Sequence, residues 1–132
     1  MVFVDTSFWI AIRYPRDAHH EEATELAPQY ADASLLTSNH VLGEAWTWLR
    51  RQAGHRAALG LVEAVMSSKR AHVTHVSSEL EETALRWLRK HDERAYSFVD
   101  ATSFALMRSM KIREALAFDG DFAAAGFREL RP

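Results

Sequence analysis

Short apolar runs alternate along the chain with longer stretches in which apolar residues recur at helical spacing. The apolar runs predict four buried strands and a possible fifth, at residues 2–4, 34–37, 71–76, 115–118 and 127–130. The stretches between them show helical patterns, such as that of Val41, Leu42, Ala45 and Leu49. This alternation predicts an α/β domain with a mostly parallel sheet of four to five short strands.

Polar residues indicate where the helices begin and end. Thr6 or Ser7 is expected to cap a helix that Pro15 ends, and Asp17 to cap a helix that runs to about Tyr30. Because the helices outnumber the strands, several crossovers should contain two helices each. Further helix caps are expected at Ser38 or Asn39, at Ser77 or Ser78, and near residues 98–100.

Composition narrows the class of protein. The chain has 132 residues, of which 48% are apolar and 26% charged, so we expect one globular domain over residues 1–132 and little disorder. There is no linker-like segment and no internal repeat. The absence of cysteine excludes a disulfide framework and a cysteine-based zinc site.

The net charge of −2 gives no overall basic signal for nucleic acid, although Arg50, Arg51 and Arg56 form a local basic cluster that can contact phosphates. A cluster of this kind is also typical of a solvated helix end.

The apolar N-terminal stretch has no basic region before it and is interrupted by Asp5, so it does not resemble a signal peptide. No apolar run approaches the roughly 20 residues that span a bilayer, and we expect a cytoplasmic protein.

Two acids follow predicted strands, and two more interrupt apolar helical patterns. Asp5 follows residues 2–4 and Asp119 follows residues 115–118. Ligands of open α/β sheets bind beyond the carboxyl ends of the strands, so these acids share one crevice if the two strands are neighbours. Glu44 and Asp100 lie among apolar helical residues and are expected near the rim of a buried face, where an ionised carboxylate needs a partner.

Each acid alone has an ordinary structural explanation. Asp5 and Asp100 can cap helices, Glu44 can lie on an exposed helix face, and Asp119 can belong to an Asp-Gly turn. Together they indicate a site for a divalent cation, because Mg²⁺ takes a few carboxylates and keeps waters and substrate phosphates as its other ligands. Such an ion would stabilise the charge that develops in phosphodiester cleavage.

Four segments containing these acids resemble one known family. They are VFVDTSFWIA with Asp5, TSNHVLGEAW with Glu44, SFVDATSFALM with Asp100, and AFDGDF with Asp119. Their order and spacing over the whole chain resemble a PIN domain, and specifically the VapC-like ribonuclease toxins of bacterial type II toxin–antitoxin systems.

This resemblance implies a parallel sheet sandwiched by helices and endonucleolytic cleavage of RNA with Mg²⁺, for which Mn²⁺ can substitute. It implies that Asp5, Glu44, Asp100 and Asp119 form the catalytic metal site. Polar positions beside the acids, at Thr6, Ser97 and Asp121, would hold a carboxylate or a water. The resemblance further implies a homodimer and a cognate antitoxin protein, and no association with membranes.

Two alternatives stay open at this point. An α/β phosphatase or phosphotransferase would use Asp5 as nucleophile, but phosphatases of the haloacid dehalogenase type need a second Asp where this chain has Ser7. A non-catalytic RNA-binding module would keep the fold without activity.

The four tryptophans raise the question of base stacking, although packing in the core or at an interface explains them more simply. They are Trp9, Trp46, Trp48 and Trp87.

Overall fold

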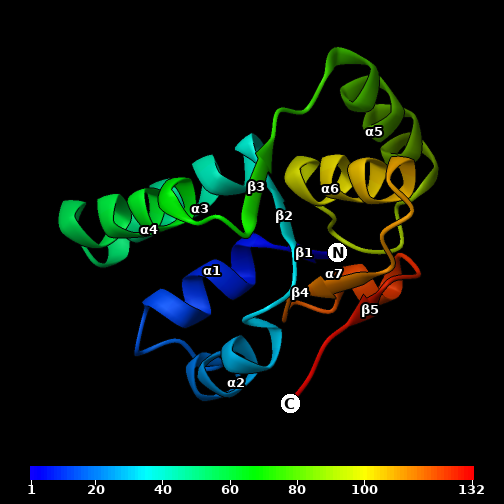
Figure 1. Ribbon diagram of the computed structural model, residues 1–132. Coiled ribbons are helices and arrows are strands. Elements are labelled where there is room, and N and C mark those ends of the chain that lie inside the picture. Colours follow the sequence, from blue (N-terminus) through cyan, green and yellow to red (C-terminus); the bar gives the residue numbers. More distant parts are fainter.

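The computed structural model describes all residues, 1–132, and its centre is a five-stranded sheet (Figure 1). Every pair of neighbouring strands is parallel, and the strand order is β3-β2-β1-β4-β5. The expected mostly parallel sheet is therefore confirmed, and it contains no antiparallel pair. The strands are β1 (Val2–Val4), β2 (Leu35–Ser38), β3 (Ala71–Thr74), β4 (Glu114–Leu116) and β5 (Arg128–Glu129).

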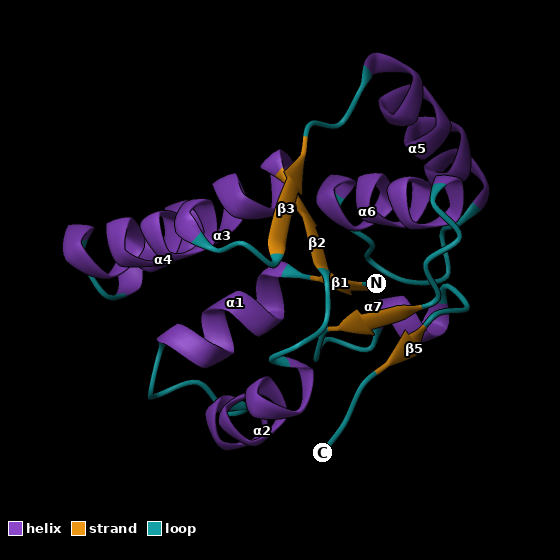
Figure 2. Ribbon diagram, in the orientation of Figure 1, coloured by secondary structure: helices purple, strands orange, loops and turns teal.

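Seven α-helices connect the strands, as Figure 2 shows. Each of the first three crossovers contains two of them, as the sequence predicts: α1 and α2, then α3 and α4, then α5 and α6. The helices are α1 (Thr6–Arg13), α2 (His20–Leu26), α3 (Asn39–Gln52), α4 (His55–Ser67), α5 (Ser78–Lys90), α6 (Phe98–Ser109) and α7 (Asp121–Ala124), with a short 3₁₀ helix at Ala27–Tyr30.

Some expected boundaries were wrong. The cap of α1 is Asp5 itself, whose carboxylate accepts the backbone N–H of Ser7. Asp17 does not begin a helix; its Oδ1 accepts the N–H of His19 at 2.8 Å, and this turn delays α2 to residue 20. The helix continues as a 3₁₀ turn at Pro28, which lacks a backbone N–H.

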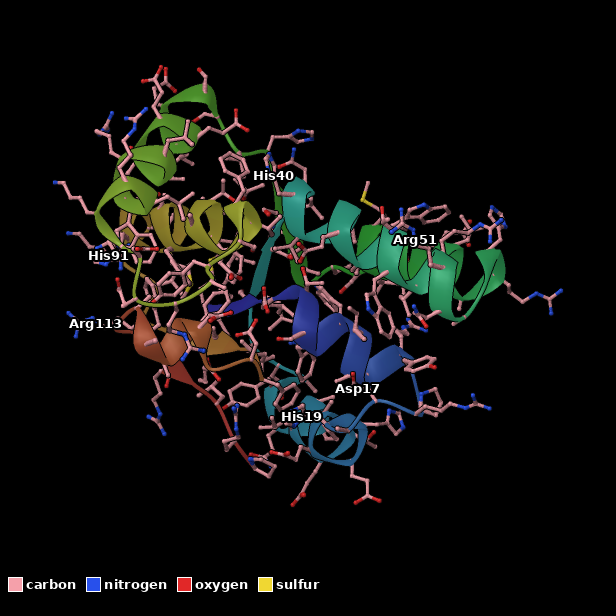
Figure 3. All side chains as sticks on the ribbon, turned by 180° about the vertical axis from the view of Figure 1, so that it is seen from behind. Asp17, His19, His40, Arg51, His91 and Arg113 are labelled. Atoms are coloured by element: carbon pink, nitrogen blue, oxygen red, sulfur yellow. The ribbon has the colours of Figure 1, made fainter.

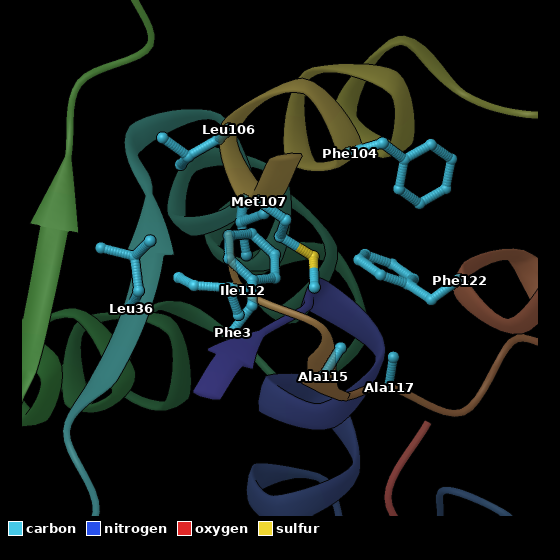
Figure 4. Packing of buried hydrophobic residues seen from close by; sticks show 10 residues of the cluster. Phe3, Leu36, Phe104, Leu106, Met107, Ile112, Ala115, Ala117 and Phe122 are labelled. Carbon is cyan, nitrogen blue, oxygen red and sulfur yellow. The ribbon is translucent and has the colours of Figure 1, made fainter. Parts of the chain in front are cut away.

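The two faces of the sheet contribute to separate apolar cores, because successive side chains of a strand point to opposite faces. On one face, Val2 and Val4 pack in a cluster with residues of α1 and α2, including Phe8. On the other face, Phe3 packs in a cluster with Phe104 and Phe122 (Figure 4). Helices therefore cover both faces of the sheet, and a third cluster, formed by α3 and α4, extends toward β3.

The order in which strands are added changes between β1 and β4. The chain places β2 and β3 on one side of β1, and β4 and β5 on the other side. Crevices at such switch points, outside the carboxyl ends of the strands, are where open α/β sheets bind ligands. The chain leaves β1 at Asp5 and leaves β4 at Ala117. None of the helices combines the length and the apolar character that a membrane crossing requires.

Candidate active site

Asp5 lies directly after β1, at this switch point of the sheet, and is 2% exposed. Its Oδ2 accepts two hydrogen bonds from Ser7, one from the backbone N–H at 3.1 Å and one from the hydroxyl at 2.7 Å. The same hydroxyl accepts the backbone N–H of Phe118 at 3.0 Å. Ser7 therefore fixes the Asp5 carboxylate and joins the ends of β1 and β4.

Asp100 comes from the first turn of α6 and is 7% exposed. Its Oδ2 accepts the backbone N–H of Ser97 at 3.0 Å, while the Ser97 hydroxyl accepts the backbone N–H of Asp100 at 2.9 Å. This reciprocal capping box satisfies two amides at the helix start. The backbone N–H of Ser97 thus fixes the direction of the Asp100 carboxylate, while the Ser97 hydroxyl caps the helix.

The loop after β4 carries two further acids. Asp119 Oδ1 accepts the N–H of Asp121 at 3.1 Å, and between them Gly120 adopts a left-handed conformation with φ of 81°. Asp121 begins α7, a single-turn helix that the sequence pattern did not predict. Arg94 anchors the loop through an ion pair from its Nε to Asp121 Oδ1 at 2.9 Å.

These elements bring three carboxylates together. One oxygen from each of Asp100, Asp119 and Asp121 can be chosen so that all three lie within 4.8 Å of one another. Asp5 lies outside that group but close enough that the charges of Asp119 and Asp100 raise its pKa. We call these four residues the acid cluster. Asp121, expected only as a supporting residue, is thus better placed for a cation than the sequence indicated.

Three carboxyl groups of the acid cluster bind protons more tightly than ordinary carboxyl groups do. Burial, followed by repulsion from Asp119, raises the pKa of Asp5 to about 8, although the hydrogen bonds from Ser7 oppose the shift. Burial, together with repulsion from Asp119 and Asp121, raises the pKa of Asp100 to about 7. Partial desolvation also raises the pKa of Asp119, although its side chain is exposed to solvent. No Lys or Arg forms an ion pair with any of these three acids.

Glu44 lies apart from the acid cluster. Its side chain is exposed on α3, although its apolar sequence neighbours predicted a position at the rim of a buried face. It lines a groove of about 550 Å³ that also contains Arg51 and Val99, the residue before Asp100. We call this the α3 groove. Figure 3 labels Arg51 and one further residue of this groove, His40, along α3.

The remaining predicted site residues have different surroundings. Thr6 is buried and its hydroxyl donates to the backbone oxygen of Val41 at 3.5 Å, so it joins α1 to α3 rather than contacting an acid. Arg50 and Arg56 are exposed and do not line the α3 groove, whereas Arg51 does.

Three residues that support the acids were missed by the sequence analysis. Ser7 is one, and its signal was the Asp-x-Ser spacing of a helix cap. Arg94 and Glu129 carried no local signal, because both act across the chain. Glu129 accepts the N–H of Gly120 at 3.3 Å and of Ala123 at 3.1 Å, which holds the loop after β4 from the edge strand.

The donor set fits a hard divalent cation. All candidate ligands are carboxylate oxygens, and the cluster contains no sulfur and no imidazole. Oxygen-only sites of few carboxylates suit Mg²⁺ and Mn²⁺ rather than Zn²⁺ or copper. A bound dication would also neutralise the mutual repulsion that raises the pKa values of these acids. The arrangement is therefore suited to hold a cation beside a phosphate group.

The fold and this acid cluster define a known class: the chain belongs to the PIN domain family, which matches residues 2–128. It is also 55% identical to the "23S rRNA-specific endonuclease VapC20" of Mycobacterium tuberculosis strains H37Rv and CDC 1551, over 100% of this chain and 99% of the relative. A crystal structure of M. tuberculosis VapC20, described as a sarcin-ricin loop cleaving toxin, superimposes with a TM-score of 0.93 at 53% identity over 100% of both chains. These matches confirm the resemblance seen in the four sequence motifs.

Proposed function

We propose that this protein is a metal-dependent endoribonuclease and the toxin of a toxin–antitoxin pair. The observation that carries the proposal is the acid cluster, in which Asp100, Asp119 and Asp121 converge beside the buried Asp5 at the switch point of the sheet. Buried carboxylates without ion pairs are costly unless a cation is bound. The membership of the PIN family and the identity to VapC20 support the same function.

In this proposal Asp5, Asp100, Asp119 and Asp121 hold Mg²⁺, and Mn²⁺ can replace it. When bound, the ion stabilises charge on the phosphate and lowers the pKa of a bound water. Glu44, which lines the α3 groove, would contribute through a water rather than by direct contact. Ser7 and Ser97 keep the Asp5 and Asp100 carboxylates oriented in the absence of substrate.

The substrate we propose is the sarcin–ricin loop of 23S rRNA, the target named for the relative that is 55% identical. RNA would approach along the α3 groove, where Arg51 can contact a phosphate and the N-terminus of α3 is close. Arg50 and Arg56 would contribute longer-range attraction. The partners are a second copy of this chain and a cognate antitoxin, and the location is the cytoplasm.

The test is cleavage of a labelled sarcin–ricin RNA hairpin and of intact ribosomes. We expect cleavage at one site with Mg²⁺ or Mn²⁺, none with chelator, and a loss of at least about a hundredfold in Asp5→Asn. The control is Asp32→Asn, which removes the same charge from a 99% exposed side chain that lies before β2, outside the acid cluster, and pairs with Arg70. Unchanged cleavage by folded Asp5→Asn protein would contradict the assignment.

A further inference from the structure

A second, smaller cavity adjoins the acid cluster. It measures about 280 Å³ and is lined by Ser7, Ile10, Asp17, His19, Trp48, Phe118 and Asp119. Two of these residues connect it to the proposed reaction, because Asp119 belongs to the acid cluster and Ser7 holds the Asp5 carboxylate. We call this space the aromatic cavity. Whatever occupies it lies next to the proposed cleavage site.

Aromatic rings form much of its wall, and neighbouring groups fix their positions. The His19 ring lies parallel to the Phe118 ring, with centroids 4.7 Å apart and 1° between the planes. Glu22 holds His19 through a contact of 3.0 Å to Nδ1. Trp48 is half-buried and packs edge-on against Tyr14 at 5.1 Å. Fixed aromatic surfaces of this kind are the platforms on which proteins stack unpaired bases.

Of the two carboxylates in the wall, Asp17 lies outside the acid cluster and is available for hydrogen bonding. Asp17 is partly buried, forms no ion pair, and uses Oδ1 to accept the backbone N–H of His19 at 2.8 Å. Figure 3 shows Asp17 and His19 together in the segment between α1 and α2. A carboxylate accepts hydrogen bonds only, so it favours a base edge with an amino group and disfavours one with a carbonyl oxygen.

The size and position of the aromatic cavity suit one base. A volume of about 280 Å³ lies at the lower end of small-molecule pockets, enough for one planar ring system. Trp48 also lines the α3 groove, on the side of Glu44 and Arg51. The acid cluster therefore has a polar groove on one side of Trp48 for the RNA backbone and an aromatic cavity on the other.

We propose that the aromatic cavity binds a single nucleobase next to the scissile phosphate, and that this base carries an exocyclic amino group. His19 and Trp48 provide the stacking surfaces, and Asp17 accepts a hydrogen bond from the amino group. The proposal rests on the proposed function for its role in cleavage. In this proposal the protein recognises one base next to the cleaved bond, in addition to the shape of a folded RNA.

The test uses free nucleosides, which need neither a metal nor cleavage. The ribosides of pyrimidin-2-one and of purine match cytidine and adenosine but lack the exocyclic amino group, and unlike uridine and inosine they carry no ring N–H that a carboxylate could accept instead. Binding is followed by the NMR signals of the Trp48 indole N–H and the His19 ring. We expect cytidine and adenosine to bind about tenfold more tightly than the two ribosides without the amino group, the discrimination of one hydrogen bond to a charged group.

Two variants, each with a matched control, isolate the two parts of the proposal. Asp17→Asn keeps an oxygen for the His19 N–H but adds an amide donor, so the preference for amino-bearing nucleosides should disappear; Asp32→Asn should leave it unchanged. Trp48→Leu should weaken binding of all four nucleosides. Trp46→Leu, at a half-buried position on the same helix outside the cavity, should not.

The outcomes separate this proposal from the proposed function. If no nucleoside shifts the Trp48 and His19 signals, or if Asp17→Asn keeps the full preference, the aromatic cavity does not read a base, whether or not RNA is cleaved. If nucleosides bind as expected but no RNA is cut with Mg²⁺ or Mn²⁺, the proposed function fails while base binding stands.

Discussion

Asp5 and Asp100 each perform two tasks with one carboxylate. Each accepts a backbone N–H at the start of a helix, and each contributes charge to the acid cluster. Both residues therefore take part in helix capping, and the same geometry is compatible with the metal-binding role that we propose for them. Substitution by Asn keeps an oxygen for the cap and removes the charge, so it tests the second task with little effect on the first.

The first prediction concerns Asp100→Asn in metal-free buffer at pH 8, where the charges of the acid cluster repel one another. Removing one charge should leave the variant as stable as the parent or about 1 kcal/mol more stable, whereas most substitutions destabilise. Mg²⁺ or Mn²⁺ should raise the melting temperature of the parent more than that of the variant. Equal metal-induced shifts in the two proteins would show that Asp100 does not bind the ion.

The second prediction concerns pH. The pKa of Asp5 is about 8 and that of Asp100 about 7 in the folded protein, against 3.8 when unperturbed. Between these limits the folded state binds more protons than the unfolded state, so the stability due to these groups is complete below pH 3.8 and is lost as pH rises through 7 and 8.

This pH effect can be measured by urea unfolding with chelator present. The free energy of unfolding of the parent should fall between pH 5.5 and 8.5 by about 1 kcal/mol more than that of Asp5→Asn. Metal ions should reduce the difference, because they bind the ionised form and their affinity rises with pH. A difference between the two proteins that stays constant over this range would contradict the raised pKa of Asp5.

At the scale of elements, apolar periodicity predicted the strands and the paired helices of the crossovers well. It did not determine that β1 and β4 are neighbours, because strand order depends on how whole crossovers pack. The helix α7 was missed because four residues are too few to show a helical period.

The residues of the candidate site were also predicted only in part. Asp5, Asp100 and Asp119 could be selected because each follows a strand or interrupts an apolar pattern. The part played by Arg94 and Glu129 could not be predicted, since their partners lie in another segment of the chain. The exposure of Glu44 also depends on how α3 packs, which the sequence pattern did not determine.

The third prediction concerns the loop after β4. Gly120 has a φ of 81°, and a Cβ added there would lie 3.4 Å from Arg94 Nη2. Gly120→Ala should therefore destabilise the protein by about 1 kcal/mol and lower its melting temperature by roughly 3–5 °C. It should also weaken Mn²⁺ binding, because Asp119 and Asp121 flank the residue.

The control for this substitution is Gly60→Ala. Gly60 lies inside α4 and has no atom within 4 Å of an added Cβ, so alanine should stabilise the helix by about 0.5–1 kcal/mol. Calorimetry of both variants and a Mn²⁺ titration provide the measurements. A Gly120→Ala protein as stable as Gly60→Ala would show that the left-handed turn is not required.

At the scale of the whole molecule, the proposed homodimer leads to the fourth prediction. Sedimentation at micromolar concentration should give a particle of twice the 15.0 kDa chain mass. A stable pair of this kind buries about 800 Å² on each partner. We expect the chain alone to arrest growth, and co-expression with a cognate antitoxin to relieve this arrest. A monomer in solution would contradict the proposed assembly without affecting the acid cluster.

The central position of β1 has a consequence for how the protein is made. β1 leaves the ribosome first, but its neighbour β4 follows about 110 residues later, which takes on the order of 5–20 s at ordinary rates of translation. Until then the nascent chain has Asp5 without the crevice that Asp119 and Asp121 complete. The acid cluster therefore cannot form until the loop after β4 has been synthesised, and a product that terminates before this loop carries no complete acid cluster.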